Sequence, residues 1–304
     1  MKIITLTLNP AFDVHCHVPV LVPCREHLAT VLSRDAGGKG VNISRALTEN
    51  GVENIALVVL GRENASDFRA SLAAARLATC EIEVKGRIRE NITIHEDASR
   101  ETRLSFPGFD AEASLLWLVE EALVPLLDKD CVVTLTGRIP VGIPMEDVKA
   151  FLHRLRFCGA RVVIDSKSFT LDDLIECRPY LIKPNEEEIE AYLGKKLATL
   201  EDACNAAKDL WQKGIEHVLI SMGCRGAVLA CAEGTFAAEA PEIHALSTIG
   251  AGDSAIAGFL AAKKEGLGAR DALRRSVAYG SAACLTEGTN PPRKEDVARL
   301  LSSV

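Results

Sequence analysis

The strongest constraint on the fold is the alternation along the chain of short apolar runs with longer segments of helical periodicity. Runs such as residues 55–60 and 131–135 are rich in Val, Ile and Leu and have no polar face. Strands of this kind are covered on both sides, as in parallel sheets. The alternation therefore predicts an α/β layered fold with a mostly parallel central sheet.

The predicted elements follow from these two periodicities. Strands are expected at residues 2–8, 55–60, 131–135, 161–164, 180–182 and 217–221. Helices are expected at residues 41–50, 65–75, 113–127, 145–157, 186–193, 201–213, 251–264, 269–285 and 294–301.

Two segments break the alternation, residues 14–34 and 80–103, which look extended with no helix inside them. Residues 81–96 alternate like a half-exposed pair of strands. No linker rich in Gly, Ser or Pro separates these segments from the rest. We therefore expect one domain, residues 1–304, with an embedded antiparallel lid formed by residues of about 12–35 and 80–106.

Charge and cysteine content exclude several classes of protein. The net charge of −7 argues against nucleic acid as the main partner. The longest apolar runs are too short to span a membrane, and the chain enters its first strand directly without a signal peptide. The 10 cysteines include no C-x-x-C pair, which favours free thiols in a reducing cytosol. A cytoplasmic protein that does not bind membranes is expected.

Residues 247–260 read S-T-I-G-A-G-D-S-A-I-A-G-F-L, a glycine turn followed by a helical stripe. Gly250 and Gly252 allow backbone amides to turn toward one point at a helix N-terminus, which is a favourable site for an anion. Asp253 lies at this helix start. From the residues alone, Asp253 is equally well explained as a helix cap or as a base beside a bound phosphate.

A second glycine-rich loop, Ala36-Gly37-Gly38-Lys39-Gly40, precedes another predicted helix that begins with Val41 and Asn42. The glycines allow a ligand to approach the backbone, and Asn42 can both donate to and accept from sugar hydroxyls. Lys39 is followed by glycine rather than Ser or Thr, so this is not a Walker A loop. Neither glycine loop has the pattern of a dinucleotide site.

Basic residues gather in the second lid segment: Lys85, Arg87, Arg89, Arg100 and Arg103. In a strand, Lys85, Arg87 and Arg89 would share one face, where like charges repel unless an anion lies between them. A solvated surface balanced by Glu81, Glu83 and Glu96 explains Lys85 equally well.

Taken together, the motifs resemble the ribokinase-like carbohydrate kinases, also called the PfkB family. The resemblance rests on A-G-G-K-G-V-N-I-S at residues 36–44 and on the motif at residues 247–260, in this order near opposite ends of the chain. Lys183-Pro184-Asn185 with Glu188, an N-x-x-E pattern, and Ser221-Met222-Gly223 with Gly226 also match. The resemblance implies a three-layer α/β/α fold with a small β-sheet lid.

Within the family, the chain is similar to the branch of 1-phosphofructokinase and tagatose-6-phosphate kinase. That similarity rests on Thr7-Leu8-Asn9-Pro10-Ala11 with Asp13, on residues 87–91 and on residues 106–109. It implies an enzyme that transfers phosphate from ATP to a hydroxyl of a ketohexose monophosphate. The product would be fructose 1,6-bisphosphate from fructose 1-phosphate, or tagatose 1,6-bisphosphate from tagatose 6-phosphate. A kinase of an unphosphorylated sugar or nucleoside, or a non-catalytic sensor, is the alternative.

The resemblance also implies a role for each matching residue. Asp253 would be the catalytic base, with the amides of Gly250, Ala251 and Gly252 as an anion hole. The sugar phosphate would be bound by Asp13, Gly37, Gly38, Lys39, Asn42, Arg89, Asn91 and Arg103. The nucleotide would meet Lys183, Asn185, Ser221, Gly223 and Gly226, and Asn185 with Glu188 would orient the water shell of Mg²⁺.

Two departures from the family pattern concern the substrate. Thr136-Gly137-Arg138-Ile139-Pro140 replaces the usual S-G-S-L-P, so Arg138 is either a further phosphate ligand or a limit on substrate size. Cys24-Arg25-Glu26-His27-Leu28 replaces the usual G-x-x-N-R, which puts one lid contact with the sugar in doubt. The family also implies a K⁺ ion near the turn Gly288-Thr289-Asn290, and exposed lid strands favour a homodimer formed through the lid.

Overall fold

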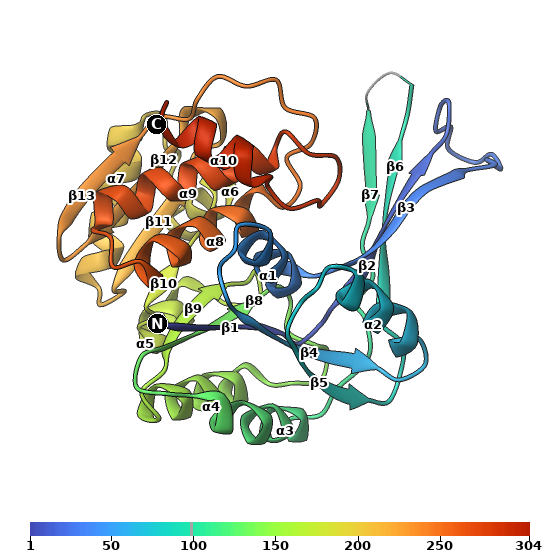
Figure 1. Ribbon diagram of the computed structural model, residues 1–304, viewed down its shortest axis with the longest axis horizontal. Coiled ribbons are helices and arrows are strands. Elements are labelled where there is room, and N and C mark those ends of the chain that lie inside the picture. Colours follow the sequence, from blue (N-terminus) through green and yellow to red (C-terminus); the bar gives the residue numbers. More distant parts are fainter. Residues whose placement is uncertain (98–99) are drawn as a thin grey trace.

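The computed structural model describes residues 1–97 and 100–304, so residues 98–99 of the expected lid segment lie outside the described part. Within that part, nine strands form one sheet in the order β13-β12-β11-β10-β9-β8-β1-β4-β5 (Figure 1). The strands from β5 to β11 run parallel to their neighbours, and β12 and β13 are antiparallel. This sheet and its helices confirm the predicted fold class.

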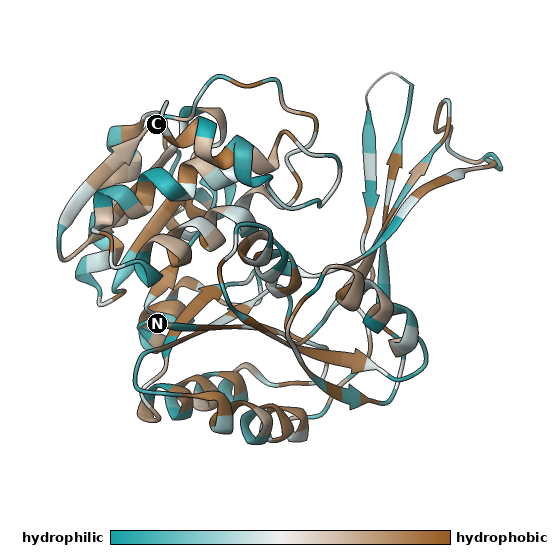
Figure 2. Cartoon of the chain, in the orientation of Figure 1, coloured by the Kyte–Doolittle hydropathy of each residue, from teal (hydrophilic) through white to brown (hydrophobic). Residues whose placement is uncertain are grey.

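The strands of this sheet are β1 (Lys2–Thr7), β4 (Ile55–Gly61), β5 (Thr79–Val84), β8 (Cys131–Thr136), β9 (Arg161–Asp165), β10 (Leu181–Ile182), β11 (His217–Ser221), β12 (Ala227–Cys231) and β13 (Gly234–Ala238). Every residue of β8 is buried, because helices cover both faces of the sheet. The apolar character of the strands is visible in Figure 2. The carboxyl ends of the parallel strands β5 to β11 meet at one edge of the sheet, where open α/β sheets bind ligands.

One face of the sheet packs against α1 (Lys39–Glu49), α8 (Ala251–Lys264), α9 (Ala269–Ala283) and α10 (Lys294–Leu301). The other face packs against α3 (Ser114–Leu123), α4 (Met145–Phe157), α5 (Leu171–Cys177), α6 (Glu186–Leu193) and α7 (Leu200–Gln212). The short 3₁₀ helices η1 (Val124–Leu126) and η2 (Gly223–Arg225) complete the elements of the body together with α2 (Ala65–Ala74). No helix in the described ranges is both long and apolar enough to cross a lipid bilayer.

The second sheet, here called the lid, has the strand order β3-β2-β6-β7 and projects from the body (Figure 1). Its strands are β2 (Ala11–His17), β3 (Thr30–Gly37), β6 (Arg89–His95) and β7 (Glu101–Leu104). The two outer pairs are antiparallel, but the central pair β2 and β6 is parallel. Phe12 of β2 anchors the lid to the body, because its ring packs edge-on against Phe68 of α2 at 5.1 Å between centroids.

The second lid segment begins later along the chain than predicted. Residues 80–84, assigned to the lid from their alternating pattern, form most of β5 and pair with β4 at the edge of the large sheet. An edge strand is covered on one face only, so it shows the same alternation as a lid strand. Lys85 and Arg87 lie between β5 and β6, so the predicted common strand face of Lys85, Arg87 and Arg89 is wrong.

One α-helix and two strands were not predicted from the sequence. Helix α5 has 7 residues and begins with a capping box formed by Thr170 and Asp173, too short for its periodicity to be read. Strands β12 and β13 form an antiparallel hairpin rich in alanine, a residue that strands seldom favour.

Candidate active site

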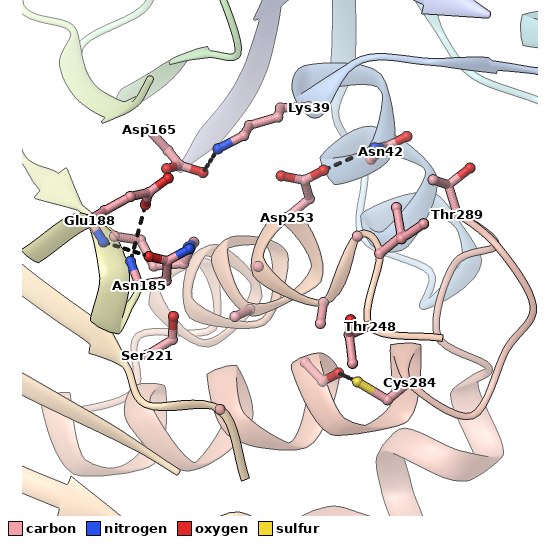
Figure 3. Close-up of a pocket in the computed structure, with 18 of the residues that line it drawn as sticks. Lys39, Asn42, Asp165, Asn185, Glu188, Ser221, Thr248, Asp253, Cys284 and Thr289 are labelled. Carbon is pink, nitrogen blue, oxygen red and sulfur yellow. Dashed lines mark hydrogen bonds and ion pairs between the residues drawn. The ribbon is translucent and has the colours of Figure 1, made fainter. Parts of the chain in front are cut away.

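A cleft of about 1360 Å³ opens at the carboxyl edge of the large sheet, beneath the base of the lid. Residues at or just beyond the ends of β1, β8, β9 and β11 line it, together with the N-termini of α1, α6 and α8. Residues from the lid, among them Asp13, Asn91 and Arg103, line one end, and residues of α9 and of the loop before α8 line another part of the wall. Figure 3 shows the part around the start of α8.

Asp253 lies in the first turn of α8, directly beyond the glycine turn. Gly250 is the N-cap residue and has a left-handed backbone, φ 80°, which favours glycine. The first amides of a helix have no partners within the helix and can bind an anion. Ala251 N donates to Thr248 O at 3.4 Å, a long hydrogen bond that an anion can replace. Among the hydrogen bonds of the described residues, the one that reaches the Asp253 carboxylate comes from Asn42 Nδ2, at 2.9 Å from Oδ2. This contact ties the side chain to α1.

The surroundings of Asp253 make it a stronger base than a free carboxylate. Its side chain is 6% exposed. Burial raises the pKa of Asp253 to about 6, and the negative charge of Asp165 acts in the same direction. Lys39, Lys183 and the hydrogen bond from Asn42 oppose this rise. A carboxyl group with such a pKa is ionised at neutral pH and still accepts a proton readily.

Lys39 extends from the first residue of α1 toward Asp165, at the end of β9 (Figure 3). Its Nζ lies 2.8 Å from Asp165 Oδ2. Burial alone would lower the pKa of Lys39, but the negative charges of Asp165 and Asp253 raise it overall. Burial likewise opposes ionisation of Asp165, yet Lys183 and Lys39 hold its pKa below the ordinary value. Both groups are therefore charged.

The lid end of the cleft carries a polar network around Asp13. Asn91 Nδ2 donates to Asp13 Oδ1 at 3.0 Å, and Arg103 Nη2 lies 3.5 Å from the same oxygen. Gly37 packs directly behind this carboxylate, since a Cβ on Gly37 would lie 2.2 Å from Asp13 Oδ2. Only glycine leaves Asp13 in this position.

Three guanidinium groups, those of Arg89, Arg103 and Arg138, lie at the same end of the cleft. Arg89 donates to the carbonyl oxygens of Phe106 at 2.8 Å and Asn9 at 3.3 Å, which fixes its orientation. Burial together with the nearby charges of Arg138 and Arg103 lowers the pKa of Arg89 to about 10, against the pull of Asp13. Three cations with one close carboxylate form a site that favours an anion.

Several buried polar atoms of the cleft have no hydrogen-bond partner within the described residues. They are Thr7 Oγ1, Asn9 Oδ1, Asn42 Oδ1, Arg89 Nε, Asn91 Oδ1 and Thr136 Oγ1. Unpaired buried polar groups are costly in a folded protein, and a polar ligand can satisfy them. Their location indicates a ligand with several oxygen atoms at the lid end and the centre of the cleft.

The opposite end of the cleft is formed by the starts of α6 and of the η2 turn. Asn185 and Glu188 form a capping box: Glu188 N donates to Asn185 Oδ1 at 2.8 Å, and Asn185 N donates to Glu188 Oε2 at 3.1 Å. The second oxygen, Glu188 Oε1, lies 3.6 Å from Lys167 Nζ. Ser221 N donates to Pro184 O at 3.1 Å and so joins this turn to β11.

The model of the pfkB family carbohydrate kinases matches residues 18–296. The chain belongs to this family. Members transfer a phosphoryl group to a carbohydrate hydroxyl, so this pfkB family kinase is a phosphotransferase.

Relatives of the kinase cover its whole length. A 1-phosphofructokinase of Vibrio cholerae is 30% identical over 303 residues, which is 100% of this chain and 96% of the relative. A 1-phosphofructokinase of Rhodobacter capsulatus is 34% identical over 306 residues, 100% of this chain and 97% of the relative.

Solved structures also match over nearly the whole length of the chain. Phosphofructokinase-2 from Escherichia coli, in complex with substrates and products, has a TM-score of 0.93 at 26% identity and covers 100% of this chain and 99% of its own. A structure of the same enzyme in complex with potassium has a TM-score of 0.91 at 26% identity, with coverage of 99% and 98%.

The structure of the pfkB family kinase brings all but one of the predicted site residues to the cleft. Gly37 is the exception, since it supports Asp13 from behind. The residues that line the cleft are Asp13, Gly38, Lys39, Asn42, Arg89, Asn91, Arg103, Arg138, Lys183, Asn185, Glu188, Ser221, Gly223, Gly226, Gly250, Ala251, Gly252 and Asp253. Of the other basic lid residues, Arg100 pairs with Glu96.

Sequence reasoning missed Asp165, Thr136 and Thr7, which also line the cleft of this pfkB family kinase. Each is the last residue of its strand, β9, β8 or β1. A signal was available, because polar residues at the carboxyl ends of parallel strands are expected to face a ligand site.

Proposed function

We propose that the protein transfers the γ-phosphoryl group of ATP to a hydroxyl of a ketohexose monophosphate, either fructose 1-phosphate or tagatose 6-phosphate. The observation that carries this proposal is the group of three arginines at the lid end of a cleft whose centre holds Asp253. A substrate that already carries a phosphate supplies the anion that these cations need. The relatives named 1-phosphofructokinase support the same substrate class.

In the proposed reaction, the acceptor hydroxyl lies beside Asp253 and loses its proton to the carboxylate. The hydroxyl oxygen forms a bond to the γ-phosphorus, and the bond from that phosphorus to the β–γ bridging oxygen breaks, which releases ADP. The amides of Gly250, Ala251, Gly252 and Asp253 stabilise the charge on the transferred group, aided by the dipole of α8. Asn42 holds the carboxylate of Asp253 toward the substrate.

The sugar is held at the lid end of the cleft. Asp13 and Asn91 bind its hydroxyls, and Gly37 and Gly38 let the sugar approach the backbone. Arg89, Arg103 and Arg138 bind the phosphate that the sugar already carries, and Lys39 assists from the start of α1.

The nucleotide occupies the opposite end. Ser221, Gly223 and Gly226 line its side of the cleft, and Lys183 meets its phosphates as a point charge. Glu188 Oε1 takes no part in the capping box and lies 3.6 Å from Lys167 Nζ, so this oxygen, together with Asn185, fits the water shell of a Mg²⁺ ion. When bound, Mg²⁺ neutralises the charge of the nucleotide phosphates.

We also propose a K⁺ site beside the turn at residues 288–290. Thr289 lines the cleft, and its Cα lies 4.0 Å from the place where a Cβ on Gly250 would lie. A cation at this turn would support the anion hole. The potassium complex of the E. coli neighbour supports the assignment.

The substrate proposal is tested by measuring ATP consumption with fructose 1-phosphate, tagatose 6-phosphate, fructose 6-phosphate and unphosphorylated fructose. We expect kcat/KM to be highest for one of the first two. A preference for unphosphorylated fructose would contradict the roles of Arg89, Arg103 and Arg138. Binding of a sugar phosphate without any release of ADP would instead indicate a sensor.

A further inference from the structure

Asp165 is a buried carboxylate at the centre of the cleft that the proposed reaction does not use. It ends strand β9, its side chain is 5% exposed, and it lines the cleft. A buried charge is costly unless it is paired. Its hydrogen-bonded partner is the ammonium group of Lys39, at 2.8 Å.

The ammonium group of Lys39 lies near the carboxylates of Asp165 and Asp253 and donates a hydrogen bond to that of Asp165. Figure 3 shows its side chain reaching toward Asp165, with Asp253 facing the same space. The hydrogen bond goes to Asp165, while Asp253 receives its hydrogen bond from the neutral amide of Asn42. Lys183, 4% exposed, is the other cation that acts on both carboxylates.

This arrangement determines how basic Asp253 can be. The charged groups that act on Asp253 in the described part of the chain are Lys39 from α1, Asp165 from β9 and Lys183 after β10. A direct ion pair between Lys39 and Asp253 would favour the ionised carboxylate and make it a poor acceptor for the hydroxyl proton. Asp165 prevents this in two ways, because it binds the ammonium group and adds a second negative charge.

We propose that Asp165 is a positioning residue, which holds the Lys39 ammonium group away from Asp253 and so keeps Asp253 free and basic enough to accept the proton of the sugar hydroxyl. The inference rests on the proposed role of Asp253 as the base. It assigns Asp165 no contact with the reacting atoms.

The test is the pH profile of kcat/KM for Asp165→Asn, Lys39→Met and the double variant, each as the full chain at saturating Mg²⁺ and ATP. In Asp165→Asn, Lys39 is released toward Asp253, which lowers the pKa of Asp253. The acidic limb of the profile, where kcat/KM falls with decreasing pH, should therefore shift to lower pH by about one unit. In Lys39→Met, an opposing positive charge is lost, so the limb should move up by a similar amount. Adding Asp165→Asn to Lys39→Met removes the remaining negative neighbour and should lower the limb again.

The double variant also protects the test against misfolding. Loss of one partner leaves a buried charge unpaired, whereas loss of both does not. If Asp165→Asn does not fold, as judged by circular dichroism, the comparison of Lys39→Met with the double variant still measures the effect of Asp165. Asp165→Glu keeps the charge and should keep the limb near its wild-type position.

Two outcomes would overturn the inference. One is an unmoved acidic limb in Asp165→Asn with a lower plateau. The other is an unmoved limb together with a higher Mg²⁺ concentration for half-maximal rate, measured in a separate Mg²⁺ titration. Failure of the proposed function is recognised separately, because Asp253→Asn would then keep its turnover. An inactive Asp253→Asn with an unmoved limb in Asp165→Asn rejects the positioning role alone.

Discussion

Asp253 takes its chemistry from its neighbours rather than from its place in the helix. The glycine turn brings it to the start of α8, and its carboxylate accepts a hydrogen bond from Asn42 of α1 at the wall of the cleft. Burial raises the pKa of Asp253 to about 6, while Lys39 and Lys183 keep its ionised form accessible. Such a balance is typical of catalytic carboxylates.

Replacing Asp253 by asparagine keeps the shape of the side chain and removes its ability to accept a proton. We expect kcat to fall by about 10²- to 10⁴-fold, the usual contribution of a general base. Binding of ATP and of the sugar phosphate, measured by calorimetry, should change little. Asp271→Asn, at an exposed position on α9, is the matched control and should keep full activity. Near-normal turnover of Asp253→Asn would show that another group takes the proton.

The same carboxylate predicts the pH dependence of the wild-type enzyme. A base works only when deprotonated, and the pKa of Asp253 is about 6. The value of kcat/KM should therefore rise with pH until about pH 6 and then level off, losing about tenfold per pH unit below that point. Initial rates in a series of buffers of equal ionic strength measure this. An acidic limb centred near the ordinary aspartate value would contradict the raised pKa.

Most of the site residues were predictable because they lie in short motifs, but the role of Asp165 was not. Gly250 to Asp253 and Gly37 to Asn42 each combine special backbone geometry with a functional side chain in one short stretch. Asp165 stands alone at the end of β9, and only the sheet brings it into the cleft. The partner of Lys39 could not be predicted, since it lies 126 positions further along the chain.

Among the elements, α6 combines two tasks in one turn. Asn185 and Glu188 close the N-terminus of the helix through their capping box and also line the nucleotide end of the cleft. Helix α7 begins with an equivalent box, formed by Thr199 and Asp202, which does not line the cleft. A comparison of the two capping boxes therefore separates the contribution of Asn185 to helix stability from its contribution to ligand binding.

Asn185→Ala and Thr199→Ala should each destabilise the protein by about 1 kcal/mol, the usual value of a lost N-cap. Only Asn185→Ala should also raise the Mg²⁺ concentration needed for half-maximal rate. Thermal unfolding measures the first effect, and rates across a Mg²⁺ titration measure the second. An equal Mg²⁺ requirement in both variants would restrict Asn185 to capping.

The elements also show where periodicity is ambiguous. Strand β5 and the lid strand β6 both alternate between apolar and polar residues, because each is covered on one face. The pattern cannot tell an edge strand of the large sheet from a strand of the lid. Pairing with β4 decides it for β5, and pairing is a property of the folded chain.

In the whole molecule, the lid exposes apolar side chains that the body does not cover. Leu28 is 96% exposed, Val31 61% and Leu32 59%. Leu28 lies just before β3, and Val31 and Leu32 belong to β3, an edge strand of the lid. Exposed apolar side chains at a sheet edge favour association. This supports the proposed homodimer through the lid.

Leu28→Asp combined with Val31→Asp should convert the dimer to a monomer, because charges would be buried at the contact without partners. Sedimentation velocity measures the change. Trp117→Asp is the control, since Trp117 is 59% exposed on α3 of the body, and it should leave the sedimentation coefficient as in the wild type. A wild-type protein that sediments as a monomer would exclude the lid contact.

The parallel pairing of β2 with β6 has a consequence for recombination between relatives. Ala11 lies opposite Arg89 in this pair, and α1, β4, α2 and β5 come between them in the chain. The lid is therefore not a cassette that one contiguous insertion could transfer. A chimera joined anywhere between residues 37 and 89 would take Asp13 from one parent and Asn91 and Arg103 from the other. The polar network around Asp13 would then combine residues of two different parent proteins. Crossovers beyond residue 104 would inherit it whole.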